Sequence, residues 1–109
     1  MPVERNTAEI DGQPLHYLRA GSGPPLLLLH GLLGGAFCWR LNLDAFSREH
    51  TILAVDLPGL GGSDAPRHLD CSMSAQAQRV LSLLAQLKLE NVDVVGSSWG
   101  GAIAMFLAA

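Results

Sequence analysis

The chain has little charge, few cysteines and no long hydrophobic run, and each shortage excludes a class of protein. Only 16% of its 109 residues are charged, with seven basic against ten acidic side chains, so no basic patch is available for nucleic acid. The two cysteines, Cys38 and Cys71, match no metal-binding or redox spacing. The longest fully apolar run near the start of the chain, residues 26–29, is far too short to span a bilayer. A small domain with an apolar core remains.

The amino terminus also lacks the pattern of a targeting signal. Residues 1–10 include Glu4, Arg5 and Glu9 and have no apolar core, unlike a secretory signal. We therefore expect a cytoplasmic protein, in which both cysteines are free, buried thiols. Because 49% of the residues are hydrophobic, we expect a folded domain. No metal or other cofactor is expected.

The hydrophobic pattern predicts strands and helices in alternation. Residues 7–10 and 15–19 flank Asp11-Gly12, which is typical of a β-hairpin turn. The wholly apolar run at 25–29 is typical of a strand buried on both faces, and short buried strands are also expected at 51–55 and 91–95. Helices are expected at 36–46, from Ser72 or Ser74 to about Leu89, and at 101–109. This order predicts an α/β fold with a mostly parallel sheet and helices on both faces.

The helix expected to end near Leu89 has an apolar and a polar face. Spacings of three and four place five residues on the apolar face: Ala77, Val80, Leu81, Leu84 and Leu87. Four polar residues fall mostly opposite: Gln76, Gln78, Ser82 and Gln86. The apolar face is predicted to pack on the sheet.

The most informative motif lies between the last strand and the last helix. Residues 96–100 read Gly-Ser-Ser-Trp-Gly, the G-x-S-x-G pattern of a nucleophile elbow. Gly96 and Gly100 flank Ser98, whereas Ser97 would have Val95 and Trp99 in those places. Glycines there let the strand and the helix pass close together. Ser98 is thus the predicted nucleophile; the alternative is an ordinary loop in which it only caps the helix.

A second glycine-rich segment could complete such a site. Residues 30–35, His-Gly-Leu-Leu-Gly-Gly, leave a buried strand at the edge where α/β sheets bind ligands. Acyl transfer needs donors for the oxyanion, and we expect the N–H groups of Trp99 and Leu32, with Leu33 as the fallback. The alternative is a plain glycine-rich turn. Neither this segment nor 59–64 or 96–101 has the residues of a phosphate-binding loop.

Three segments together resemble the α/β-hydrolase superfamily over nearly the whole chain. Residues 29–32, 56–64 and 95–101 occur in the order and at about the spacing of that family. The resemblance implies an eight-stranded, mostly parallel sheet with its second strand antiparallel. Residues 1–109 would then supply about five strands, as the N-terminal portion of one domain. It implies Ser98 as nucleophile, Trp99 and Leu32 as oxyanion donors, and five structural residues near the site: His30, Gly31, Asp56, Gly96 and Gly100.

The catalytic acid and base of this family follow the nucleophile. The four histidines here, His16, His30, His50 and His68, all precede Ser98. Of these, His30 would lie beside the serine, but it resembles a residue that braces the loop. We therefore expect a fragment truncated soon after the nucleophile helix begins. It would need a C-terminal half with the acid and a histidine, and would be inactive alone.

The resemblance implies a serine hydrolase of small ester or related acyl substrates that acts through an acyl-enzyme. Serine at the elbow argues against epoxide hydrolases and haloalkane dehalogenases, which place aspartate there. A carboxylesterase leads, while carbon–carbon bond hydrolases and aminopeptidases of the fold stay open. The expected partner is a small acyl compound, with no nucleic acid and no membrane insertion. Other classes remain: a ligand-binding protein on the same fold, or a non-catalytic interaction module.

Overall fold

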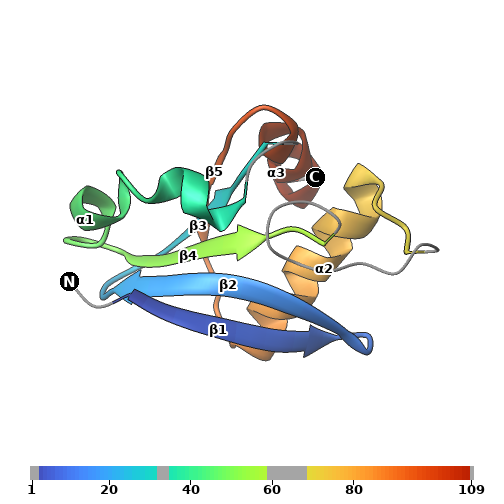
Figure 1. The fold of residues 1–109 in the computed structure, drawn as a ribbon, viewed down its shortest axis with the longest axis horizontal. Coiled ribbons are helices and arrows are strands. Elements are labelled where there is room, and N and C mark those ends of the chain that lie inside the picture. The colour runs from blue at the N-terminus through green and yellow to red at the C-terminus, as the bar shows by residue number, and fades with distance from the viewer. Residues whose placement is uncertain (1–2, 32–34, 59–68, 109) are drawn as a thin grey trace.

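A mixed β-sheet forms the centre of the molecule (Figure 1). The computed structural model describes residues 3–31, 35–58 and 69–108. The five strands that it describes lie in the order β1-β2-β4-β3-β5, with β2 antiparallel to β1 and β4, and β3 parallel to β4 and β5. The sheet is thus mixed, with β2 alone reversed. The strands are β1 (Val3–Ile10), β2 (Gln13–Gly21), β3 (Pro25–Leu29), β4 (Thr51–Asp56) and β5 (Asp93–Gly96).

The predicted hairpin is confirmed and is longer than the sequence indicated. Strands β1 and β2 pair from Val3↔Ala20 to Ile10↔Gln13. Asp11 and Gly12 both have positive φ, 51° and 78°, as the two central residues of a type I′ turn require. The turn therefore fixes the register of the first two strands.

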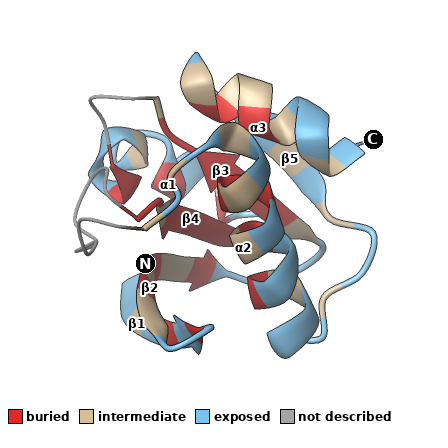
Figure 2. Ribbon diagram, turned by 90° about the vertical axis from the view of Figure 1, so that its right-hand side faces the viewer, coloured by how far each residue is buried: buried red, intermediate tan, exposed pale blue. Residues whose placement is uncertain are grey.

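Helices cover both faces of the sheet, as expected (Figure 2). Helices α2 (Met73–Gln86) and α3 (Trp99–Ala108) lie on one face; the 3₁₀ helix η1 (Ala36–Trp39) and the short helix α1 (Leu43–Phe46) lie on the other. No helix among the described residues is long and apolar enough to cross a membrane. Alternate side chains of β3 and β4 fill the two cores: Leu27, Leu29, Leu53 and Val55 under α2 and α3, and Leu26, Leu28, Ile52 and Ala54 under η1 and α1.

The single helix expected over residues 36–46 is wrong. A 3₁₀ turn over Ala36–Trp39 and one α-helical turn over Leu43–Phe46 stand there instead, separated by residues 40–42. Neither piece has a side-chain hydrogen bond at its N-cap. A helix this short gains little from its own hydrogen bonds, so packing on the sheet decides its shape. One of the two thiols expected to be buried, Cys38, lies in this segment and is exposed, whereas Cys71 is half-buried.

Helix α2 begins where the sequence indicated, but it buries a different face from the predicted one and ends before the predicted end near Leu89. Ser72 is the N-cap, and its Oγ accepts a hydrogen bond from the Ala75 N–H at 3.2 Å. The helix ends at Gln86 because Lys88 has a φ of 58°, outside the helical region. Leu81, predicted on the apolar face, is exposed, whereas Gln76, predicted on the polar face, is buried. The buried stripe consists of Gln76, Ala77, Val80 and Leu83.

Candidate functional site

Ser98 lies on the turn between β5 and α3, in strained backbone geometry. Its φ is 56°, in the left-handed region that costs a residue with a Cβ about 1–2 kcal/mol. Its side chain lies in an exposed position. The Gly100 and Gly101 N–H groups donate to the Ser97 and Ser98 carbonyl oxygens, both at 2.9 Å, and hold the turn. Such strain persists only where its surroundings enforce it.

The two flanking glycines allow backbones to touch where side chains would collide. A Cβ built on Gly100 would lie 2.6 Å from the His30 carbonyl oxygen, at the exit of β3. A Cβ built on Gly96 would lie 2.6 Å from the Gly101 nitrogen, in the first turn of α3. Distances this short require the backbone to move. Glycine at both positions therefore brings the start of α3 against the ends of β3 and β5.

The exit of β3 lies beside the serine. The Ser97 N–H donates to the Leu29 carbonyl oxygen at 3.0 Å. A Cβ built on Gly31 would lie 3.4 Å from the Ser98 Cβ and 3.9 Å from its Oγ. An uncovered stretch of backbone thus faces the serine side chain.

One of the two expected oxyanion donors is described, and it is next to the serine. Among the residues that the structure describes, the Trp99 N–H has no acceptor, as the first amide of α3. Leu32 and its fallback Leu33 lie outside the described residues. The geometry of a second donor from that segment therefore stays a prediction.

Both ring nitrogens of His30 are engaged in hydrogen bonds. The side chain is completely buried. Its Nδ1 lies 2.7 Å from the Gly31 carbonyl oxygen, so this nitrogen carries the proton and donates. Its Nε2 accepts from the Leu57 N–H at 3.0 Å. No nitrogen is left to receive a proton from Ser98, and the ring ties the end of β3 to the residue after β4.

Asp56 makes a second tie at the same edge of the sheet. It is the last residue of β4, and its Oδ1 accepts a short hydrogen bond from the Ala36 N–H, at the start of η1. The carboxylate thus ties the start of η1 to the end of β4. The other acidic residue of the 56–64 motif, Asp64, lies outside the described residues.

Gln76 is a buried polar residue that the sequence reasoning missed. It is completely buried, and its Nε2 donates to the Pro58 carbonyl oxygen at 2.8 Å. Its spacing of four from Val80 is the one signal that places it on the packed face of α2. Leu57 and Pro58 are thus bonded from two sides, by His30 and by Gln76.

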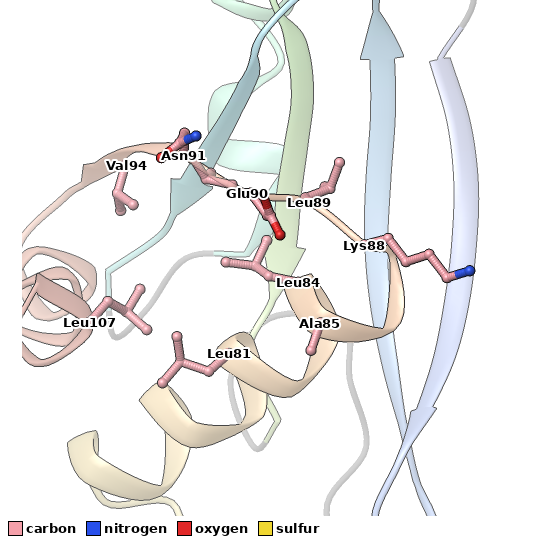
Figure 3. Close-up of a pocket in the computed structure, with 10 residues that line it drawn as sticks. Leu81, Leu84, Ala85, Lys88, Leu89, Glu90, Asn91, Val94 and Leu107 are labelled. Atoms are coloured by element: carbon pink, nitrogen blue, oxygen red, sulfur yellow. The ribbon is translucent and has the colours of Figure 1, made fainter.

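A groove of about 720 Å³ lies away from these residues (Figure 3). It runs between α2 and α3 at the amino end of β5, whereas Ser98 follows the carboxyl end of that strand. The groove is mainly apolar, and its walls include Leu81, Leu84, Leu89, Val92, Val94 and Leu107.

Among the described residues, no group of three or more His, Cys, Asp or Glu side chains is placed to hold a metal ion.

Known proteins are similar to this chain over most of its length. A soluble epoxide hydrolase of Corynebacterium sp. (strain C12) is 37% identical over 97% of this chain and 37% of its own length. Epoxide hydrolase 3 of Xenopus tropicalis is 39% identical over 89% of this chain and 27% of its own. The chain therefore spans about a third of the length of these relatives.

Solved structures give the same fold. The epoxide hydrolase CorEH superposes with a TM-score of 0.93 at 36% identity, over 98% of this chain and 38% of its own. A bacterial membrane phospholipase A superposes with a TM-score of 0.93 at 30% identity, over 97% of this chain and 35% of its own. The family model of the alpha/beta hydrolase fold matches residues 24–109. The chain belongs to the α/β-hydrolase fold family.

Proposed function

We propose that this chain supplies the nucleophile and oxyanion donors of a serine-dependent hydrolase of small ester or related acyl substrates. The observation that carries the proposal is Ser98 itself. It has a φ of 56° at an exposed position on the strand-to-helix turn, and the neighbouring Trp99 N–H has no acceptor among the described residues. An acyl carbonyl attacked by its Oγ would develop an oxyanion, and we expect the Trp99 N–H to stabilise it. Leu32 is the proposed second donor.

A serine nucleophile on the strand-to-helix turn suits acyl substrates and does not suit epoxides. Relatives of this chain include epoxide hydrolases and a phospholipase A. Serine attack on the carbonyl of an ester breaks the bond to the alcohol, which leaves with the proton from the serine hydroxyl. The acyl group stays on the serine as an ester, which water can hydrolyse to the acid to regenerate the serine. Serine attack on an epoxide carbon would give an ether, which water does not cleave under mild conditions. The hydroxyl at position 98 therefore favours ester chemistry over epoxide chemistry.

His30 cannot serve as the base that activates Ser98, since both of its ring nitrogens are used in other hydrogen bonds. We propose that residues 1–109 form the N-terminal portion of one α/β-hydrolase domain. The catalytic acid and histidine would then come from polypeptide outside these residues. This proposal fits the fraction of the relatives' length that the chain spans.

Turnover on matched ester and epoxide panels tests the proposal. The protein is prepared at the length that its gene encodes, here called the encoded protein. We expect hydrolysis of short-chain aryl esters. The Ser98→Ala substitution is expected to reduce this by a factor on the order of ten thousand, because the nucleophile is lost. The Ser97→Ala protein, altered at the neighbouring hydroxyl, is the matched control and keeps its activity.

Three outcomes would contradict the proposal. Ester hydrolysis that survives Ser98→Ala would mean that another group is the nucleophile. Epoxide opening without ester hydrolysis would place the protein with its epoxide-hydrolase relatives. Labelling of Ser98 without turnover of either panel would indicate a ligand-binding protein on this fold.

A further inference from the structure

We propose that Gln76 is a positioning residue for the Ser98 site and acts through Pro58 and His30. The inference rests on the proposed function. Gln76 lies on α2, in a face otherwise made of apolar side chains, and it is completely buried. A polar side chain in such a place is costly unless it is fully hydrogen-bonded. Its partners therefore indicate what it does there.

The amide of Gln76 can be oriented in only one way. Its Nε2 faces the Pro58 carbonyl oxygen, which can only accept, at 2.8 Å. Its Oε1 faces Nη1 of Arg79, which can only donate, at 2.9 Å. Arg79 thus holds the amide with its NH₂ group directed at Pro58. The Cys71 thiol is a second and weaker donor to the same carbonyl, with an Sγ–oxygen distance of 3.6 Å.

A continuous set of contacts leads from Gln76 to the serine. Pro58 follows Leu57, whose N–H donates to His30 Nε2 at 3.0 Å. His30 donates from Nδ1 to the Gly31 carbonyl oxygen at 2.7 Å, and Gly31 faces the Ser98 side chain with room between them for little more than a Cβ. Gln76 thus fixes the residues that hold His30 in place. Loss of its donor would let Leu57 and Pro58 shift, and with them the backbone that faces Ser98.

The test is the rate at which a fluorophosphonate labels Ser98 in the encoded protein. Gln76→Met keeps the length of the side chain without its amide, and Gln76→Glu keeps an acceptor for Arg79 without the donor. Both are expected to slow labelling about tenfold, because small displacements of reacting groups have effects of this size. We expect kcat for ester hydrolysis to fall by a similar factor, with KM changing less than twofold.

Gln78 provides the matched control. It lies two residues further along α2, is exposed, and has no hydrogen-bond partner among the described residues. Gln78→Met and Gln78→Glu are expected to label at the rate of the unaltered protein. If both Gln76 substitutions prevent folding, Arg79→Met decides the question. It removes the bond that orients the amide and should slow labelling about threefold.

The outcomes separate this inference from the proposed function. Labelling of folded Gln76→Met within twofold of the unaltered rate, with only a lower melting temperature, would reduce Gln76 to a structural residue and overturn the inference. An unchanged rate for Arg79→Met, where Gln76 cannot be substituted, would do the same. Labelling that persists in Ser98→Ala would instead contradict the proposed function.

Discussion

Two regions of the molecule differ in their packing: the carboxyl end of the sheet, and the flank formed by β5 and the outer side of α3, here called the open flank. At the carboxyl end, His30, Asp56 and Gln76 all have hydrogen-bond partners, and glycines bring the backbones into contact. At the flank, β5 pairs only with β3 among the described strands, and Val95, Met105 and Phe106 are exposed. The described residues that pack around Ser98 thus hold its geometry. The described residues do not cover the outer side of α3.

Helix α3 leaves large apolar side chains exposed. Met105 is 75% exposed and Phe106 is 50% exposed, on a helix with no charged residue. An uncharged helix with exposed side chains of this size suits a surface that another segment covers. We propose that polypeptide outside residues 1–109 covers this flank in the encoded protein.

The largest effect is expected at the carboxyl end, from Gly100→Ala. The new Cβ would collide with the Leu29 carbonyl oxygen and lie 2.6 Å from the His30 carbonyl oxygen, and both of these oxygens belong to the backbone. We expect a loss of about 3 kcal/mol or more in the free energy of unfolding, at the upper end of overpacking costs. Urea unfolding of the encoded protein, followed by tryptophan fluorescence, measures it.

Gly101→Ala is the matched control for that substitution. A Cβ on Gly101 meets its nearest atom, the Gly96 carbonyl oxygen, at 3.3 Å, and alanine favours the helix by about 1 kcal/mol. We expect a change of less than about 1 kcal/mol in either direction. Equal losses for both substitutions would contradict the close backbone contact at Gly100.

An intermediate effect is expected at the open flank, from Met105→Lys. If further polypeptide covers α3, the substitution buries a charge and should cost about 2 kcal/mol or more of the free energy of unfolding. Leu41→Lys is the control, because Leu41 is 85% exposed beside η1 and should change stability by less than about 0.5 kcal/mol. Equally small effects at both positions would show that the flank stays open.

The smallest effect is expected from the strain at Ser98. Glycine adopts a φ of 56° without the Cβ penalty, whereas alanine retains it. We expect the Ser98→Gly protein to be about 1 kcal/mol more stable than the Ser98→Ala protein, although neither should turn over esters. Parallel urea titrations compare them. A more stable alanine variant would mean that the turn is not strained.

Local patterns in the sequence predicted much of the fold. Asp11-Gly12 predicted the hairpin, the run at 25–29 matched β3, and Ser72 is the N-cap of α2. These features depend on neighbouring residues alone. Leu83 and Leu84 point to different sides of α2 and both are apolar. The sequence pattern therefore could not decide which side of the helix faces the core. That ambiguity is why Leu81 and Gln76 were assigned to the wrong faces.

The site was predictable in its motif but not in its support. The G-x-S-x-G spacing predicted which serine stands on the turn, because it depends on five consecutive residues. The engagement of both His30 nitrogens and the bond from Gln76 to Pro58 join residues far apart in the chain. Only the folded structure brings such pairs together. For the same reason, the exposure of Cys38 follows from the packing of η1 and not from its sequence.

The most direct test of the account is to find which residue a fluorophosphonate modifies in the encoded protein. The labelled protein is digested, and the modified peptide is sequenced by mass spectrometry. The account predicts a single adduct on Ser98, none on Ser97, and no labelling of the Ser98→Ala protein. An adduct on another residue, or an unlabelled protein that still hydrolyses esters, would contradict the assignment of Ser98 as the nucleophile.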